Sequence, residues 1–349
     1  MRTVGVRHYC TYFDRGFLIQ GLALARSLAR HDAAAQLWVL ALDDFTADVL
    51  GEIGGPRLSV VRLGELEAGD AALATAKANR SRVEYYFTLS PCWPRWLLAL
   101  YPEIDRVTYV DADLFFFASP TPIFSAMDEA GASVLVTEHR FPAALQHYAQ
   151  HGRFNVGVLS WRNDAAGRAC LDHWRVRCLA WCFDRVEAGN YADQKYLDAW
   201  PEQLGAALLV LQDPAVNLAP WNWMTREAAG VTPVIFHFAR FRPLGGDWWW
   251  RSGQLDYGVM PRRLRRAIYG PYVRALLAAR AEIAARRAGF DFSRRGARTG
   301  RDFWRGLPLR AVFGGDWVRA GDGFWNLRLG LGRWSGQCLA KLRTIFLRR

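Results

Sequence analysis

The sequence predicts an α/β fold with a mainly parallel sheet, and three observations favour that class. Short apolar, β-branched runs alternate with segments of helical periodicity along residues 1–250. With 349 residues, 51% of them hydrophobic, the chain is long enough to bury a large core. Polar residues gather where several predicted strands end, which is where open α/β sheets bind their ligands.

Each element is predicted from its own pattern. Residues 17–29 and 166–182 carry apolar side chains at helical spacing. Residues 84–101 are also predicted to be mostly helical, with Pro91 and Pro94 marking a break. The predicted strands are rich in Val, Leu, Ile and aromatic residues and are bounded by turn residues. They are residues 3–9, 36–42, 58–63, 107–110, 133–137, 156–161 and 234–238.

Positive charge is concentrated in the last hundred residues. Residues 251–349 contain 22 Lys and Arg against 6 Asp and Glu, whereas residues 1–250 contain 23 and 27. We therefore expect an enzyme-like domain over residues 1–250 and a basic helical extension over residues 251–349. Such an asymmetry predicts a polyanionic partner for the extension.

The sequence also argues against several classes of protein. No run reaches the roughly 18 apolar residues that span a bilayer, and no signal-peptide pattern precedes the first strand. The absence of G-x-G-x-x-G and of G-x-x-x-x-G-K-[ST] argues against NAD(P) enzymes and P-loop NTPases. The six cysteines form no C-x-x-C pair, which indicates reduced, buried thiols in a cytoplasmic protein.

The acidic pair Asp111 and Asp113 follows the apolar run 107–110. On a strand, residues i and i+2 point to the same side, so both carboxylates can face one point. Carboxylate oxygens suit Mg²⁺ or Mn²⁺. Solvated loop carboxylates and an Asp–Arg structural network are the alternatives.

Four further segments place polar side chains at strand ends or in turns. A structural role is open in three of them: Asn155 as a turn residue, Asp193 as a helix cap and His237 as a satisfied strand-end histidine. The segments are residues 154–159, 191–197, 217–222 and 235–243.

In this order, the acidic pair and the four segments resemble the GT-A nucleotide-sugar glycosyltransferases, most closely those of glycosyltransferase family 8. The resemblance covers about residues 1–245 and implies a Rossmann-like GT-A domain. It implies that Asp111, Asp113 and His237 hold Mn²⁺ or Mg²⁺, and that Arg242, before Pro243, contacts phosphate.

The resemblance implies further contacts to the sugar donor. Thr11 and Tyr12 lie where the first strand of that family meets the nucleoside, and Ala112 lies where its backbone approaches the ribose. The family often has Tyr-Tyr-Arg before its acidic pair, but Phe87 occupies the third position here. Arg80 is our candidate for that charge.

Two basic alternatives to Arg80 are Lys77 and Arg82. A second departure from the family pattern lies in its terminal motif, roughly H-x-x-G-x-x-K-P, where Arg240 replaces the glycine. The spacing to the proline is also one residue shorter in this chain.

The resemblance also implies the residues around the transferred sugar. Asn155 corresponds to a residue that bonds the sugar or lies near the acceptor, and Asp193 and Gln194 correspond to a pair beside the anomeric carbon. The family retains anomeric configuration, so Asp193 or Gln194 would stabilise the cation or act as a transient nucleophile.

The predicted function is therefore metal-dependent, retaining transfer of a sugar, of the hexosyltransferase type. The expected donor is a nucleotide-diphosphate sugar, a UDP-sugar in particular, and the expected acceptor is a saccharide or lipid-linked glycan. One alternative is transfer to a protein or to the enzyme itself, as in glycogenin. Another is a non-catalytic nucleotide-sugar-binding or membrane-adaptor protein.

Residues 331–346 predict an amphipathic helix with Trp334 and leucines opposite Lys and Arg. That pattern is typical of an interfacial helix on an anionic membrane surface, which would place the protein peripherally on the inner face of the membrane. A helix packed on the domain is the alternative. Nucleic-acid binding is disfavoured because no helix-turn-helix, zinc-finger or RNP signature is present.

Overall fold

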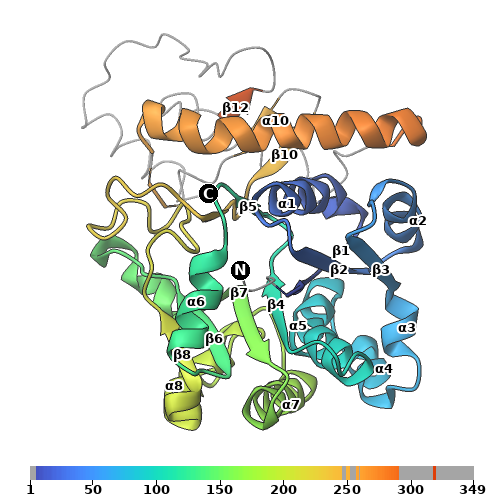
Figure 1. Ribbon diagram of the computed structural model, residues 1–349, viewed down its shortest axis with the longest axis vertical. Helices are drawn as coiled ribbons and strands as arrows, with labels where there is room; N and C mark the ends of the chain where they lie inside the picture. Colours follow the sequence, from blue (N-terminus) through green and yellow to red (C-terminus); the bar gives the residue numbers. More distant parts are fainter. Residues whose placement is uncertain (1–4, 246–248, 252–256, 259, 291–316, 320–349) are drawn as a thin grey trace, which may run out of the picture.

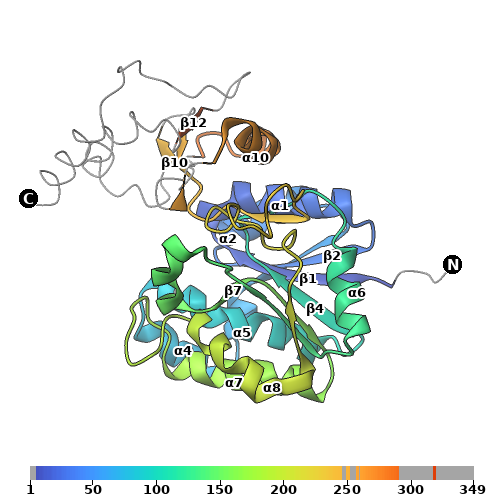
Figure 2. The ribbon, with the colours of Figure 1, turned by 90° about the vertical axis from the view of Figure 1, so that its left-hand side faces the viewer.

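The computed structural model describes residues 5–245, 249–251, 257–258, 260–290 and 317–319. A seven-stranded sheet lies at the centre, with helices on both of its faces (Figures 1 and 2). The strand order is β3-β2-β1-β4-β7-β6-β8. The strands are β1 (Arg7–Phe13), β2 (Ala35–Ala41), β3 (Leu58–Arg62), β4 (Arg106–Val110), β6 (Val134–Glu138), β7 (Phe154–Arg162) and β8 (Leu208–Leu211).

The sheet is mainly parallel, as predicted. Strands β3, β2, β1 and β4 run parallel to one another, and β6 is parallel to β8. Only β7 runs against its neighbours β4 and β6 in this sheet. Because the strand order turns back after β1 to continue at β4, the carboxyl ends of these two central strands open toward the crevice that binds ligands in such sheets.

A different set of helices covers each face of the sheet. Figure 2 shows α1, α2 and α10 on one face and α4, α5, α7 and α8 on the other. Two large apolar clusters fill the corresponding layers. The helices are α1 (Leu18–His31), α2 (Asp44–Ile53), α3 (Leu63–Glu67), α4 (Ala71–Ala78), α5 (Arg82–Leu100), α6 (Thr121–Glu129), α7 (Ala165–Ala180), α8 (Trp200–Leu204) and α10 (Arg262–Arg286).

Polar caps set the starts of several helices. The side chain of Asp43 accepts a hydrogen bond from the Thr46 amide at the start of α2. At the start of α5, Ser81 and Glu84 form a reciprocal capping box. These caps satisfy amide groups that would otherwise lack partners in the first helical turn.

Two smaller sheets complete the described structure. Strand β5 (Leu114–Phe116) pairs antiparallel with β9 (Ile235–His237), which brings the end of the predicted domain beside the acidic pair. Strands β10 (Arg242–Gly245), β11 (Trp249–Arg251) and β12 (Trp317–Arg319) form a separate three-stranded sheet. The last predicted strand, residues 234–238, therefore lies outside the main sheet.

Several sequence predictions were wrong in detail. The first strand covers Arg7–Phe13 rather than residues 3–9, and helices α2, α3, α4, α6 and α8 were not predicted. No break occurs in α5 at Pro91 or Pro94. Both prolines are buried. The packing of α5 against the sheet and α7 outweighs the loss of the hydrogen bonds that the prolines remove, so the helix continues through them.

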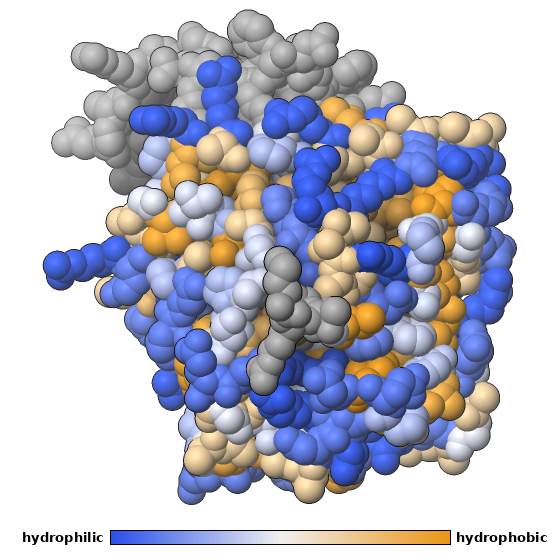
Figure 3. Space-filling view, viewed as in Figure 1, coloured by the Kyte–Doolittle hydropathy of each residue, from blue (hydrophilic) through white to orange (hydrophobic). Residues whose placement is uncertain are grey.

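Helix α10 lies in the basic extension, which the sequence predicts to be helical. Its buried side chains, including Ile268, Tyr272 and Leu276, belong to the same cluster as α1 and the sheet. The interfacial helix predicted over residues 331–346 lies outside the described residues. Among the described residues, no helix is long and apolar enough to cross a membrane. Figure 3 shows hydrophilic and hydrophobic residues interspersed over one face of the molecule.

Candidate metal and sugar-donor site

The acidic pair lies in a turn and not on a strand, so the alternation argument for its geometry was wrong. Strand β4 ends at Val110, and Asp111, Ala112 and Asp113 lead into β5. The Leu114 amide donates to the Asp111 carbonyl at 3.1 Å, and this turn brings the two carboxylates to one side. The carboxylates still converge, as predicted.

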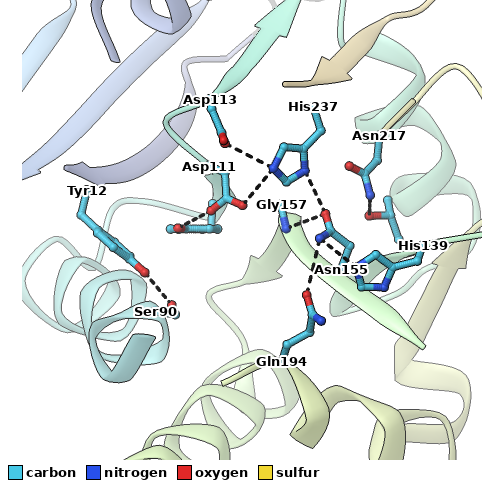
Figure 4. Close-up of polar contacts among 12 residues, drawn as sticks. Tyr12, Ser90, Asp111, Asp113, His139, Asn155, Gly157, Gln194, Asn217 and His237 are labelled. Atoms are coloured by element: carbon cyan, nitrogen blue, oxygen red, sulfur yellow. Dashed lines mark hydrogen bonds and ion pairs between the residues drawn. The ribbon is translucent and has the colours of Figure 1, made fainter. Parts of the chain in front are cut away.

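Pairing of β5 with β9 places His237 beside the acidic pair. His237 is opposite Leu114 in the register, and the next amide, that of Phe238, donates to the Asp113 carbonyl at 2.9 Å. The His237 Nε2 atom lies 3.2 Å from Asp113 Oδ1 and 3.6 Å from Asp111 Oδ2 (Figure 4). One ligand atom from each of the three residues lies within 4.8 Å of the others.

Asn155 connects His237 to a chain of polar groups behind the acidic pair (Figure 4). Its Oδ1 atom lies 3.3 Å from His237 Nδ1 and also accepts from the Gly157 amide at 3.0 Å. Its Nδ2 atom faces His139 Nε2 at 3.3 Å and Gln194 Oε1 at 3.5 Å. Since an amide oxygen only accepts, His237 carries a proton on Nδ1, and its Nε2 atom faces the carboxylates.

Gly157 allows this close approach. A Cβ atom at residue 157 would collide with Asn155 Oδ1 and lie 2.8 Å from His237 Nδ1. The F-N-x-G segment therefore needs its glycine because the imidazole of His237 packs directly on the backbone of β7.

The electrostatics of the cluster favour a cation. Burial raises the pKa of Asp111, and repulsion from Asp113 raises it further, while His237 and the Tyr109 hydroxyl, at 2.7 Å, act in the opposite direction. Burial alone would lower the pKa of His237, but Asp113 and Asp111 outweigh it and raise the pKa. Two carboxylates and one imidazole nitrogen form a donor set that Mn²⁺ accepts readily, whereas Mg²⁺ prefers oxygen alone.

A pocket of about 380 Å³ opens beside this cluster. Tyr12 and Ala112 line it, as expected for donor contacts, together with Asp111, Asp113 and His237. Further lining residues are Phe13, Asp14, Phe17, Leu42, Arg82, Val83, Tyr86, Phe87 and Tyr109. Thr11 is fully buried, and its hydroxyl has no hydrogen-bond partner among the described residues.

The basic candidates have different positions. The Arg80 guanidinium bonds the Thr88 hydroxyl and, at 2.7 Å, the Leu179 carbonyl, and Arg80 does not line the pocket. Arg82 does line it, at the start of α5. Lys77 pairs with Glu67 at 2.8 Å. Arg242 begins β10, and the structure describes its backbone only.

Asp193 does not cap a helix with its side chain, although it precedes the 3₁₀ helix Gln194–Ala199. Its carboxylate instead accepts from the Ser90 hydroxyl at 2.5 Å. The Tyr12 hydroxyl lies 2.9 Å from Ser90 (Figure 4). Because Ser90 gives its proton to Asp193, Tyr12 donates to Ser90. Burial raises the pKa of Asp193 to about 7.

Sequence reasoning missed three residues of this network: Ser90, Tyr109 and His139. Tyr109 has a signal, since it lies two residues before Asp111 at the end of the same strand. Ser90 sits within α5 and His139 in a loop after β6, and no local pattern distinguishes either one. Burial holds His139 neutral by lowering its pKa to about 3, so its ring accepts from Asn155.

Comparison with known proteins identified two relatives but no matching family model. YfnF of Bacillus subtilis strain 168, described as uncharacterized, is 34% identical over 253 residues, covering 67% of this chain and 81% of YfnF. YfnD of the same strain, also described as uncharacterized, is 30% identical over 246 residues, covering 67% of this chain and 78% of YfnD.

Solved glycosyltransferases also resemble the chain. Mouse xyloside xylosyltransferase 1 matches 66% of this chain and 97% of its own at 16% identity, with a TM-score of 0.46. The match to LgtC, a galactosyltransferase, covers 66% of this chain and 87% of LgtC at 18% identity, with a TM-score of 0.46. The match to GlyE of Streptococcus pneumoniae covers 81% of this chain and 64% of GlyE at 15% identity, with a TM-score of 0.48.

The GT-A class and membership of family 8 both stay predictions for this chain. Because the TM-scores are below 0.5, nothing about the sugar donor or acceptor of those enzymes is carried over to this chain.

Proposed function

We propose that the chain, which belongs to the same family as YfnF and YfnD of Bacillus subtilis, is a metal-dependent glycosyltransferase. The support is an Asp-Asp-His cluster that borders a pocket in an α/β fold. The observation that carries the proposal is the convergence of Asp111, Asp113 and His237 on the wall of that pocket. The proposed donor is a nucleotide-diphosphate sugar, with UDP as the nucleotide.

Asp111, Asp113 and His237 would hold Mn²⁺ or Mg²⁺ in this site. Such a cation supplies Lewis-acid stabilisation to a departing diphosphate. The chain adds a hydrogen bond from Tyr109 that orients Asp111 and one from His237 to Asn155 that fixes the imidazole.

The rest of the pocket fits a nucleoside. Aromatic side chains of Tyr12, Phe17, Tyr86 and Phe87 form much of the lining, and planar bases pack well on such surfaces. Arg82 adds positive charge on the same wall, where it would face the anionic donor. Arg82 therefore replaces Arg80 as our candidate for the basic residue that Phe87 displaces.

Asp193, Gln194 and Asn155 are the proposed catalytic group beside the transferred sugar. Ionised Asp193 would stabilise an oxocarbenium-like transition state or attack the anomeric carbon, and both roles fit retention of configuration. The Ser90 hydroxyl supports the ionised form by donating to it, against the effect of burial. Gln194 is held by the His151 carbonyl at 3.1 Å and faces Asn155.

A series of rings beyond His237 supports a saccharide acceptor. Trp221 lies edge-on to His237 at 5.2 Å between ring centres, and Tyr257 and then Tyr148 follow at 5.8 and 5.5 Å. The two tyrosines are partly exposed. Aromatic faces of this kind bind the apolar faces of sugars, so we propose a free or lipid-linked glycan as the acceptor.

A panel of nucleotide sugars tests the proposal in the presence of Mn²⁺ and of EDTA. We expect one donor to raise the melting temperature and to be hydrolysed or transferred only with Mn²⁺. A labelled sugar appearing on the protein band would indicate self-glycosylation instead. Binding without hydrolysis or transfer to any acceptor would favour a non-catalytic nucleotide-sugar-binding protein.

A further inference from the structure

A second cavity, of about 350 Å³, lies between α1 and α10, away from the acidic cluster. Figures 1 and 2 together show α10 crossing α1, on the opposite side of α1 from the main sheet. The cavity walls come from these two helices and from β5. Both basic and apolar side chains line it.

The charged side chains that line this cavity are all basic. Three arginines, Arg26, Arg30 and Arg274, line it together with His31, and its lining contains no Asp or Glu. Guanidinium groups that share one cavity repel one another unless an anion lies among them.

One carboxylate on α10 offsets only part of this positive charge. Glu282 on α10 pairs with Arg26 and also lies 3.8 Å from Arg286, so it is shared by two guanidinium groups. Arg30 and Arg274 have no ion pair within the part of the chain that the structure describes. Burial, and then the charge of Arg286, lower the pKa of Arg26; burial, and then Arg30, lower the pKa of His31.

Arginine is the side chain best suited to phosphate, because its planar fork donates two parallel hydrogen bonds. The apolar part of the cavity, formed by Phe117, Pro271 and Ala275, would face the organic part of a phosphate ester. We propose that the cavity between α1 and α10 is a second anion site, which binds a phosphate group through Arg26, Arg30 and Arg274.

This site is independent of the proposed sugar transfer. It uses no residue of the Asp111, Asp113 and His237 cluster, and it needs no divalent cation. Two sources supply the same chemistry, a free phosphate or diphosphate in solution and the phosphate of an anionic lipid headgroup. Both are accessible to experiment with the whole chain.

The test is titration calorimetry with inorganic pyrophosphate in EDTA, which removes metal-dependent binding at the donor pocket. We compare the wild type with Arg30→Gln/Arg274→Gln and with Arg266→Gln as a matched control, since Arg266 is exposed on α10 but does not line the cavity. We expect Arg30→Gln/Arg274→Gln to weaken pyrophosphate binding at least tenfold and Arg266→Gln to change it less than twofold. Melting curves confirm folding of each variant.

A second arm uses co-sedimentation with phosphatidylglycerol and phosphatidylcholine vesicles. Loss of preference for phosphatidylglycerol in the double variant, and not in Arg266→Gln, identifies a lipid headgroup as the source. A pyrophosphate effect alone identifies a free anion. Equal pyrophosphate and vesicle binding by the double variant and the control, or no binding by the wild type, overturns the proposal.

Discussion

The Nδ1 atom of His237 lies 3.3 Å from the side-chain oxygen of Asn155, and this contact decides which nitrogen faces the acidic pair. Asn155 is itself fixed by the Gly157 amide at 3.0 Å and by His139 at 3.3 Å. A residue of the F-N-x-G segment therefore orients a histidine 82 positions later in the chain. Such outer contacts hold metal ligands in one tautomer and one orientation.

Replacing Asn155 should weaken metal binding without removing a ligand. In Asn155→Ala, the His237 ring loses its acceptor, and we expect the affinity for Mn²⁺ to fall about 10- to 100-fold. Titration calorimetry measures this change, with Asn163→Ala as a control because Asn163 bonds main-chain carbonyls far from the site. Equal affinities in the two variants would argue against the orienting role.

Gly157→Ala should damage the site by displacing side chains. The new Cβ would lie 2.8 Å from His237 Nδ1, so the imidazole or the β7 backbone must move. We expect Mn²⁺ affinity to fall at least tenfold and stability to fall by about 1–3 kcal/mol. Gly51→Ala on α2 is the matched control, because nothing lies within 4 Å of its Cβ position. A Gly157→Ala protein that binds Mn²⁺ normally would contradict the packing described.

Asp193 predicts a pH dependence of stability. Its folded-state pKa of about 7 lies above the usual value of 3.8, so the group favours the folded state fully below pH 4 and loses that contribution as the pH rises to 7. Asp193→Asn removes this loss. In thermal or urea unfolding in EDTA, the free energy of unfolding of Asp193→Asn should rise relative to that of the wild type by on the order of 3 kcal/mol between pH 5 and pH 8. If the difference in free energy of unfolding between the two proteins does not change with pH, the pKa of Asp193 is not raised.

Ser90→Ala should shift the pH profile of catalysis. The Ser90 hydroxyl, 2.5 Å from Asp193, lowers the pKa that burial raises. Without it, Asp193 should ionise at higher pH, and the acidic limb of kcat/KM should move upward if the ionised form acts on the sugar. Ser125→Ala on α6, an exposed position, is the control. An unmoved limb would remove Asp193 from the proposed catalytic group.

The sequence predicted the α/β class because alternating strands and helices leave a strong local signal. The candidate site could be predicted from Asp111 and His237 in the same way, because polar residues that follow apolar runs can be recognised in the sequence alone. The pairing of β5 with β9, which brings those residues together, depends on contacts across more than a hundred residues. The three-residue strands involved are too short for any periodicity to reveal.

Local patterns were misleading where tertiary packing decides the outcome. Pro91 and Pro94 indicate a helix break, yet packing keeps α5 intact, and this in turn places Ser90 under Asp193. Arg80 and Arg82 look equivalent in the sequence. The capping box at Ser81 starts α5 so that Arg82 reaches the pocket, while Arg80 bonds Leu179 on the neighbouring helix.

The most direct measurement is the affinity for UDP with Mn²⁺ and with EDTA, in the wild type and in Asp113→Asn. If Asp111, Asp113 and His237 hold the cation that binds the diphosphate, UDP should bind the wild type at least tenfold more tightly with Mn²⁺, and Asp113→Asn should lose that difference. Asp128→Asn, an exposed aspartate in ion pairs with Arg106 and Arg162, should keep it. UDP affinity independent of Mn²⁺, or a Mn²⁺ effect that survives in Asp113→Asn, would contradict the metal site.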